Sequence, residues 1–140
     1  MNRKTKILVV ENEMPLAMLM VHVLTRVGCD VQVVNSGGKA MALAKETRFD
    51  LIALDMDIGR QDASNLDICT ELKQRHISRN TPVFLISAKP CESDIQEGMK
   101  RGAADYIVKP FDLTDFIYRV ILHAKIKVNQ PTKVVMGAAA

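Results

Sequence analysis

The sequence contains few cysteines and few aromatic residues. Among its 140 residues it has no tryptophan, two tyrosines, four phenylalanines and three cysteines. The cysteines, Cys29, Cys69 and Cys91, are odd in number and show no C-x-x-C spacing, which excludes a disulfide framework and a cysteine-based zinc site. We therefore expect free thiols in a reducing compartment.

Long apolar runs and charge of one sign are also absent. The first apolar run, residues 7–10, follows a basic start and stops at Glu11, so it is too short for a signal peptide or a membrane span. The net charge is +3, from 19 basic and 16 acidic residues interspersed along the chain. A nucleic-acid surface requires clustered basic residues. We expect a cytoplasmic protein that neither enters a membrane nor binds nucleic acid directly.

The apolar residues that are present divide the chain into alternating strands and helices. The composition, 48% hydrophobic and 25% charged, is that of one globular domain. Short apolar runs predict five strands, at residues 7–10, 31–34, 51–54, 83–86 and 106–108. Apolar residues at helical spacing predict helices at residues 15–27, 39–47, 65–76, 93–101 and 113–128, with Asn65 as an N-cap. We assign residues 1–128 to this domain and residues 129–140 to a C-terminal tail or the start of a linker.

The alternation of strands and helices predicts an α/β fold. Parallel strands joined by right-handed helical crossovers form a doubly wound, three-layer sandwich. The expected strand order is 2-1-3-4-5, the flavodoxin-like (βα)5 winding, in which strands 1 and 3 flank the ligand crevice. The uninterrupted apolar run at residues 51–54 suits the centre of such a sheet, where a strand is buried on both faces.

Polar residues follow the strands at the edge where such sheets bind ligands. They are Glu11, Asn12 and Glu13 after the first strand, Asp55 and Asp57 after the third, Ser87 after the fourth and Lys109 after the fifth. Clustered carboxylates repel one another and need a cation, and hard oxygen ligands suit Mg2+. The pattern predicts phosphorylation of a carboxylate. Asp55 attacks, Mg2+ and Lys109 neutralise the phosphoryl oxygens, and Ser87 orients them.

Four segments of the chain carry a family signature. They are GAADYIVKPF at residues 102–111, VVENE at residues 9–13, DLIALD at residues 50–55 and FLISA at residues 84–88. With these segments the chain resembles the receiver family of response regulators, the CheY-like domains of two-component signalling. The resemblance covers residues 6–125, and the first segment, which matches the fifth-strand signature of the family, is the most specific.

The resemblance implies a role for each of the polar residues. Asp55 is the phosphoacceptor, with Ser87 and Lys109 beside it. The Mg2+ ligands come from Glu11, Asn12, Asp55 and the backbone carbonyl of Asp57. Ser87 and Tyr106 form the switch, in which the aromatic ring rotates, and the Lys109–Pro110 bond is cis.

The resemblance also implies partners. A sensor histidine kinase or a phosphotransfer protein supplies the phosphoryl group, and a downstream effector or output domain reads the result. The surface that switches consists of the fourth helix, the fifth strand and the fifth helix, and a homodimer through that surface is a further expectation. Such a domain is a signalling protein rather than an enzyme, although it promotes its own phosphoryl transfer and dephosphorylation.

Two departures from the family pattern affect the metal site and its loop. Asn12 stands where the family usually has a second carboxylate, and an amide oxygen is a weaker ligand, so we expect weak Mg2+ binding. Glu13 is a substitute ligand only if its side chain points into the site. Gly59 stands where the family usually has a proline.

A third departure concerns the choice of phosphoacceptor. Two extra residues precede the segment at 65–67 that resembles the start of the family's third helix, so counting back from it would select Asp57. We favour Asp55, because it follows Leu54 directly and keeps the usual spacing from Asp50.

Three functions are compatible with these residues. The first is a phosphorylatable receiver controlled by a histidine kinase. The second is a pseudo-receiver, a protein–protein interaction module that acts without phosphorylation; Asn12 favours it, whereas Asp55, Ser87 and Lys109 oppose it. The third is a hydrolase that uses Asp55 and Asp57 as nucleophile and acid, but it needs cap segments for which 140 residues leave no room.

Overall fold

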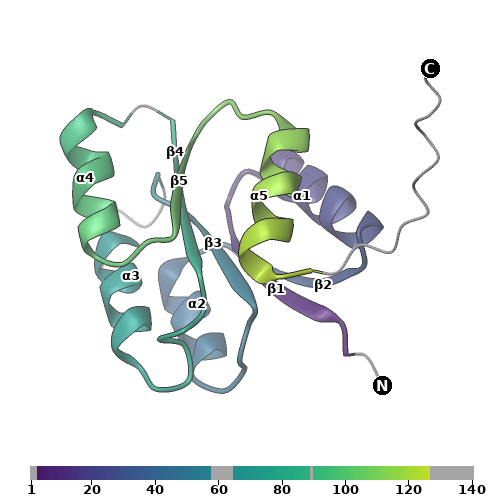
Figure 1. Ribbon diagram of the computed structural model, residues 1–140, viewed down its shortest axis with the longest axis horizontal. Helices are drawn as coiled ribbons and strands as arrows, with labels where there is room; N and C mark the ends of the chain where they lie inside the picture. The colour runs from purple at the N-terminus through teal and green to yellow at the C-terminus, as the bar shows by residue number, and fades with distance from the viewer. Residues whose placement is uncertain (1–2, 58–64, 89, 127–140) are drawn as a thin grey trace.

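The computed structural model describes residues 3–57, 65–88 and 90–126, which form a sheet between two layers of helices (Figure 1). The strands are β1 (Thr5–Val10), β2 (Cys29–Val34), β3 (Leu51–Asp55), β4 (Val83–Ser87) and β5 (Asp105–Val108). The helices are α1 (Met14–Arg26), α2 (Gly37–Ala44), α3 (Asn65–Gln74), α4 (Glu92–Lys100) and α5 (Leu113–Ala124). All strand pairs are parallel and the order is β2-β1-β3-β4-β5, which confirms the predicted fold.

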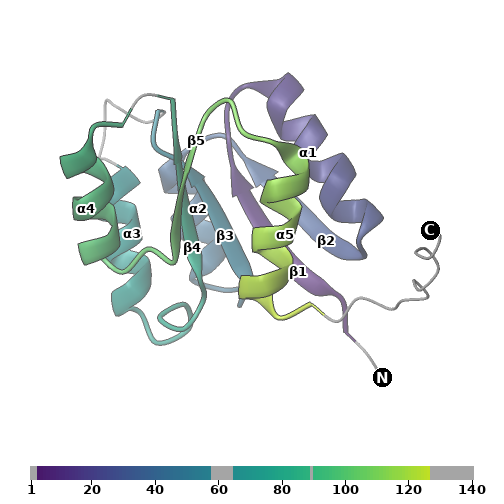
Figure 2. The same ribbon diagram turned by 45° about the horizontal axis from the view of Figure 1, so that its top comes forward.

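The two faces of the sheet are covered by different helices. α2, α3 and α4 lie on one face, and α1 and α5 lie on the other (Figures 1 and 2). Successive residues of β1 point to opposite faces, so Leu8 and Val10 belong to one core and Ile7 and Val9 to the other. Two hydrophobic cores, one on each face, therefore hold the sheet in place.

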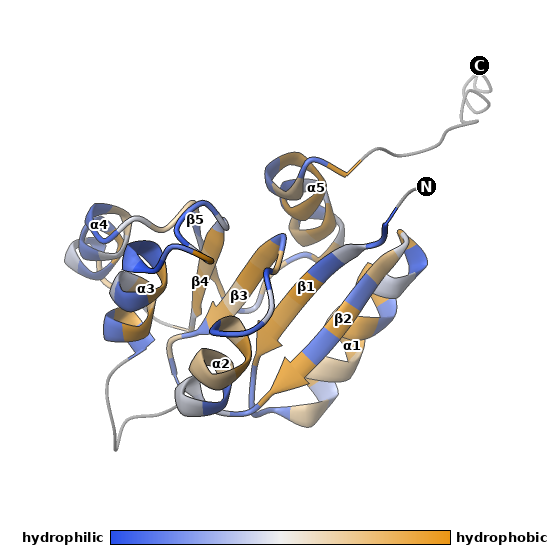
Figure 3. Ribbon diagram, turned by 90° about the horizontal axis from the view of Figure 1, so that it is seen from below, coloured by the Kyte–Doolittle hydropathy of each residue, from blue (hydrophilic) through white to orange (hydrophobic). Residues whose placement is uncertain are grey.

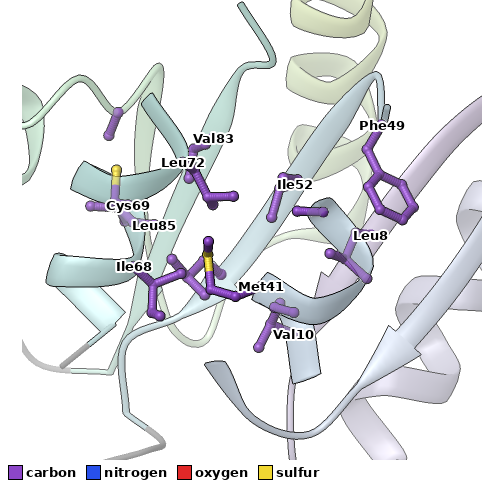
Figure 4. Packing of buried hydrophobic residues seen from close by; sticks show 14 residues of the cluster. Leu8, Val10, Met41, Phe49, Ile52, Ile68, Cys69, Leu72, Val83 and Leu85 are labelled. Carbon is purple, nitrogen blue, oxygen red and sulfur yellow. The ribbon is translucent and has the colours of Figure 1, made fainter. Parts of the chain in front are cut away.

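The apolar strands β3 and β4 form the centre of the fold. Every residue of both strands is buried, which explains why their sequences show no polar alternation (Figure 3). On the α2–α3 face, Met41, Ile68 and Leu72 pack with residues of the strands (Figure 4). On the other face, Phe116 of α5 is fully buried in the second core. The strand ends that carry polar residues are thus fixed by packing on both sides.

Some predicted element ends differ from the structure. β2 begins at Cys29 rather than residue 31, and α5 ends at Ala124, so the prediction that it continues to residue 128 is wrong. Lys125 adopts a left-handed conformation, with φ of 57°, and this conformation ends the helix before Pro131 can. The predicted loop at residues 58–64 and the predicted tail at 129–140 lie outside the described residues.

Within residues 3–57, 65–88 and 90–126, no helix is long and apolar enough to cross a membrane.

Candidate functional site

Carboxylates at the carboxyl ends of β1 and β3 meet the lysine that follows β5 at one edge of the sheet. Asp55, the last residue of β3, and Glu11, the first residue after β1, are each only 1% exposed. Lys109 Nζ lies 2.8 Å from Asp55 Oδ2 and 3.6 Å from Glu11 Oε1. It also lies 4.0 Å from Glu13 Oε1 and 3.9 Å from Asp57 Oδ2. One ammonium group is therefore surrounded by four carboxylates.

Burial and mutual repulsion shift the proton equilibria of this cluster. Burial, together with the neighbouring Asp55 carboxylate and its negative charge, raises the pKa of Glu11 from 4.5 to about 7. Burial alone would lower the pKa of Lys109, but its hydrogen bond to Asp55 and the surrounding carboxylates raise it above its ordinary value. The lysine therefore stays charged at neutral pH, whereas Glu11 sits close to its titration midpoint.

The two buried carboxylates fit a hard divalent cation. Glu11 Oε2 accepts a hydrogen bond from the backbone N–H of Glu13 at 3.1 Å, which fixes the side chain, while Oε1 is buried and has no hydrogen-bond partner among the residues that the structure describes. In the part of the chain that the structure describes, no group of three His, Cys, Asp or Glu side chains forms a complete metal site. Mg2+ suits such an incomplete set, because it usually keeps several water ligands and binds one or two carboxylates. The exposed side chain of Asn12 lies next to this pair in sequence.

Asp57 enters the site through its side chain as well as its backbone. Its N–H donates to Asp55 Oδ1 at 2.8 Å. Its Oδ1 accepts from Ser87 Oγ at 3.2 Å, and its Oδ2 accepts from the backbone N–H of Ala88 at 3.0 Å. In the favoured interpretation of the sequence, only the backbone carbonyl of Asp57 has a role. The contacts of its carboxylate depend on how β3 and β4 lie side by side, which no local pattern reveals.

Asn65 contacts the backbone of Asp55, whereas the sequence predicted that it is the N-cap of a helix. It is the first residue of α3 rather than an N-cap, it is 2% exposed, and its Nδ2 donates a hydrogen bond to the backbone carbonyl of Asp55. Its Oδ1 has no partner within the described ranges and would lie 2.8 Å from a Cβ at Gly37. Asn65 therefore ties the start of α3 to the end of β3, a role that the sequence did not suggest.

Tyr106 of β5 lies beneath α4. Its ring is half-buried, and a Cβ built on Gly98 would lie 3.2 Å from two of the ring carbons and 2.7 Å from Leu85 Cδ1. Burial raises the pKa of Tyr106, although the neighbouring Ser87 hydroxyl opposes this shift. Ser87 thus donates to the carboxylate site and lies close to the aromatic residue under α4. The Lys109–Pro110 peptide bond is cis, as expected.

The raised pKa of Glu11 predicts an unusual pH dependence of stability. The folded pKa, about 7, lies above the ordinary value of 4.5, so the folded chain binds the extra proton. That stabilisation is complete below pH 4.5 and is lost as the pH rises through 7. In EDTA at pH 8, Glu11→Gln should raise the free energy of unfolding by about 1–3 kcal/mol.

Urea titrations at several pH values test this effect. The wild type and Glu11→Gln should converge at low pH, and Glu13→Gln, at a side chain that is 66% exposed, should follow the wild type. Parallel pH profiles for wild type and Glu11→Gln would show that Glu11 is not destabilised by its neighbours.

Comparisons with known proteins agree on one family. The model of the response regulator receiver domain matches residues 7–121. Response regulator ArlR of Staphylococcus saprophyticus is 35% identical over 116 residues, which are 83% of this chain and 50% of that protein. The chain therefore spans about half the length of this curated relative.

Solved structures show the same architecture. The receiver domain of Francisella response regulator 1452 is 28% identical, with a TM-score of 0.78, and the match covers 87% of this chain and 98% of that one. The receiver domain of sensor histidine kinase PA1611 from Pseudomonas aeruginosa is 21% identical, with a TM-score of 0.78, and the match covers 88% of this chain and 99% of that one. The latter structure is described with a magnesium ion coordinated in its active-site cleft.

Proposed function

The chain belongs to the response regulator receiver domain family, and from this premise we propose that it accepts a phosphoryl group on Asp55. The donor is a sensor histidine kinase or a phosphotransfer protein. The observation that carries the proposal is the buried Asp55 carboxylate, which lies 2.8 Å from Lys109 Nζ beside the buried Glu11. Domains of this kind are signalling proteins that are not generally classed as enzymes.

The residues of the site have complementary tasks in the transfer. A carboxylate oxygen of Asp55 attacks phosphorus, and the bond between phosphorus and the donor's leaving atom breaks. Lys109 neutralises negative charge on the phosphoryl oxygens, and the Ser87 hydroxyl donates a hydrogen bond to one of them. Glu11, Asn12, Asp55 and the backbone carbonyl of Asp57 would hold Mg2+. When bound, this ion offsets the repulsion between the carboxylates and the incoming phosphoryl group.

Incubation with a small phosphodonor tests the proposal directly. In the presence of Mg2+ and acetyl phosphate, intact-mass measurement should show one added phosphoryl group, and hydroxylamine should remove it because an acyl phosphate is labile to that nucleophile. A chain that never gains this group would instead be a pseudo-receiver, an interaction module independent of phosphorylation. The exposed Asn12 in place of a carboxylate is the observation that favours this alternative.

We propose that phosphorylation is transmitted through Ser87 and Tyr106 to α4, β5 and α5. The Ser87 hydroxyl moves to meet a phosphoryl oxygen, and the half-buried ring of Tyr106 adjusts beneath α4. Because a ligand shifts an equilibrium only through its different affinity for the two states, Ser87→Ala should uncouple them. Amide chemical shifts in residues 87–122 should respond to a phosphate mimic in the wild type and far less in Ser87→Ala. Equal responses would exclude a Ser87-dependent switch.

We also propose that Asn12 weakens Mg2+ binding. Asn12→Asp adds a charged hard oxygen next to Glu11, so the dissociation constant for Mg2+ should fall several-fold, by about 1 kcal/mol of binding free energy or more. The same charge should destabilise the metal-free protein, because it adds repulsion to a site with four carboxylates. Mg2+ titrations of both chains measure the difference. Equal affinities would remove residue 12 from the ligand set.

Several partners follow from the same proposal. The phosphoryl donor acts upstream, and an effector or an output domain of a longer protein responds to the surface formed by α4, β5 and α5. A homodimer through that surface is part of the proposal, as is action in the cytoplasm without direct binding of nucleic acid. The relative ArlR is about twice as long as the match, which is consistent with an output domain attached to such a receiver.

A further inference from the structure

The Asp57 carboxylate lies close to hydrogen-bond donors and a positive charge at the ends of β4 and β5. Ser87 Oγ donates to one of its oxygens at 3.2 Å, and the Ala88 N–H donates to the other at 3.0 Å. The second oxygen also lies 3.9 Å from Lys109 Nζ. A hydroxyl, an amide and an ammonium group therefore converge on one anion that is not the proposed phosphoacceptor.

The Asp57 carboxylate and its donors lie beside Asp55, the proposed phosphoacceptor. The backbone N–H of Asp57 donates to Asp55 Oδ1 at 2.8 Å, and Lys109 bonds Asp55 Oδ2 at 2.8 Å, so both carboxylates share one small site. Preorganised N–H, O–H and ammonium groups are the donors that stabilise phosphoryl oxygens. A hydrogen that is bonded to Asp57 is not available to a second anion at the same time.

We propose, building on the phosphorylation of Asp55, that the Asp57 carboxylate is an internal competitor for the phosphoryl oxygens. In the unphosphorylated chain it accepts the hydrogen bonds of the Ser87 hydroxyl and the Ala88 N–H, and the incoming phosphoryl group must displace it from these donors. Displacement is feasible because the Asp57 side chain is 39% exposed, so that water can solvate the released carboxylate. Asp57 is a regulatory residue in this scheme and not a nucleophile.

The competition lowers the rate at which the site is phosphorylated. When a site is competent only while its competitor is absent, the apparent rate falls by the competent fraction. A carboxylate that holds the donors for nine-tenths of the time therefore slows labelling about tenfold. Removing the carboxylate should raise the rate by a similar factor when the nucleophile and Lys109 are intact.

Asp57→Ala tests the competition, with Asp57→Asn as the conservative second variant. The full chain is labelled with acetyl phosphate at saturating Mg2+, and the initial rate should rise about three- to tenfold in Asp57→Ala. A second readout needs no phosphodonor: hydrogen exchange of the Ala88 amide should accelerate about tenfold when its charged acceptor is removed.

Glu13→Gln is the matched control for charge. Glu13 Oε1 lies 4.0 Å from Lys109 Nζ, almost the same distance as Asp57 Oδ2 at 3.9 Å. This variant therefore removes one nearby negative charge and leaves the Asp57 hydrogen bonds to Ser87 and Ala88 in place. Its effect on the labelling rate measures the contribution of charge alone, and Ala88 exchange should match the wild type.

The two readouts separate failure of this proposal from failure of the proposed phosphorylation. Labelling of the wild type with no increase in Asp57→Ala, or with the same increase in Glu13→Gln, overturns the competition and leaves phosphorylation intact. Unchanged Ala88 exchange in Asp57→Ala also overturns it. If no chain is labelled but exchange of the Ala88 amide accelerates in Asp57→Ala, both the competition and the phosphorylation of Asp55 are refuted. The Asp57 carboxylate would then only connect the ends of β3 and β4.

Discussion

Asp55→Asn should reduce phosphoryl labelling to background, whereas Asp57→Asn should still be labelled. Asp55 is the last residue of β3, is 1% exposed and lies 2.8 Å from Lys109 Nζ. An amide has no anionic oxygen to attack phosphorus, so the substitution removes the nucleophile while it keeps the side-chain volume. The measurement is intact mass after incubation with acetyl phosphate and Mg2+, followed by peptide mapping of the labelled residue.

The paired variants decide between the two aspartates that the sequence offers. Both chains lose one negative charge from the same cluster, so a general electrostatic effect should alter them alike. Labelling that persists in Asp55→Asn and disappears in Asp57→Asn would mean that the acceptor lies two residues further along the chain. The buried position of Asp55 and the 39% exposure of the Asp57 side chain favour Asp55.

Gly98→Val should destabilise the domain by about 1–3 kcal/mol, because it overpacks the contact between α4 and the sheet. A Cβ at residue 98 would lie 2.7 Å from Cδ1 of the fully buried Leu85 and 3.2 Å from the ring of Tyr106. Val is itself no worse than glycine in a helix, so the loss must come from packing. Urea denaturation should show a lower midpoint with an unchanged slope.

Gly38→Val is the matched control, since Gly38 also lies within a helix but a Cβ there meets nothing within 4 Å. Its stability should stay close to that of the wild type. If Gly98→Val were equally stable, α4 could move away from β4 and β5 without cost. The Tyr106 ring would then not be confined by the helix above it.

The fold follows from patterns that are local in the sequence. Uninterrupted apolar runs such as residues 51–54 and 83–86 indicate strands buried on both faces, and their alternation with helices restricts the connections to parallel, right-handed crossovers. These patterns predicted the strand order that the structure has. They also located Asp55, Ser87 and Lys109 at one edge, because the carboxyl ends of parallel strands point the same way. The end of α5 was missed because Lys125 adopts a left-handed conformation that residues other than glycine rarely signal.

Tertiary structure alone decided which side chains meet at that edge. The sequence shows that Glu11, Asp55 and Asp57 follow strands, but only packing buries the first two and leaves the third partly exposed beside Ser87 and Ala88. The raised pKa of Glu11 has the same origin, since desolvation depends on everything that surrounds a group and not on its neighbours in the chain. Gly98 lies within α4, where glycine has a low helix propensity, and only the packing shows that its missing Cβ makes room for Leu85 and Tyr106. Strand pairing and side-chain direction bring together residues that are far apart in sequence. The distances between their side chains cannot be derived from the spacing of residues along the chain.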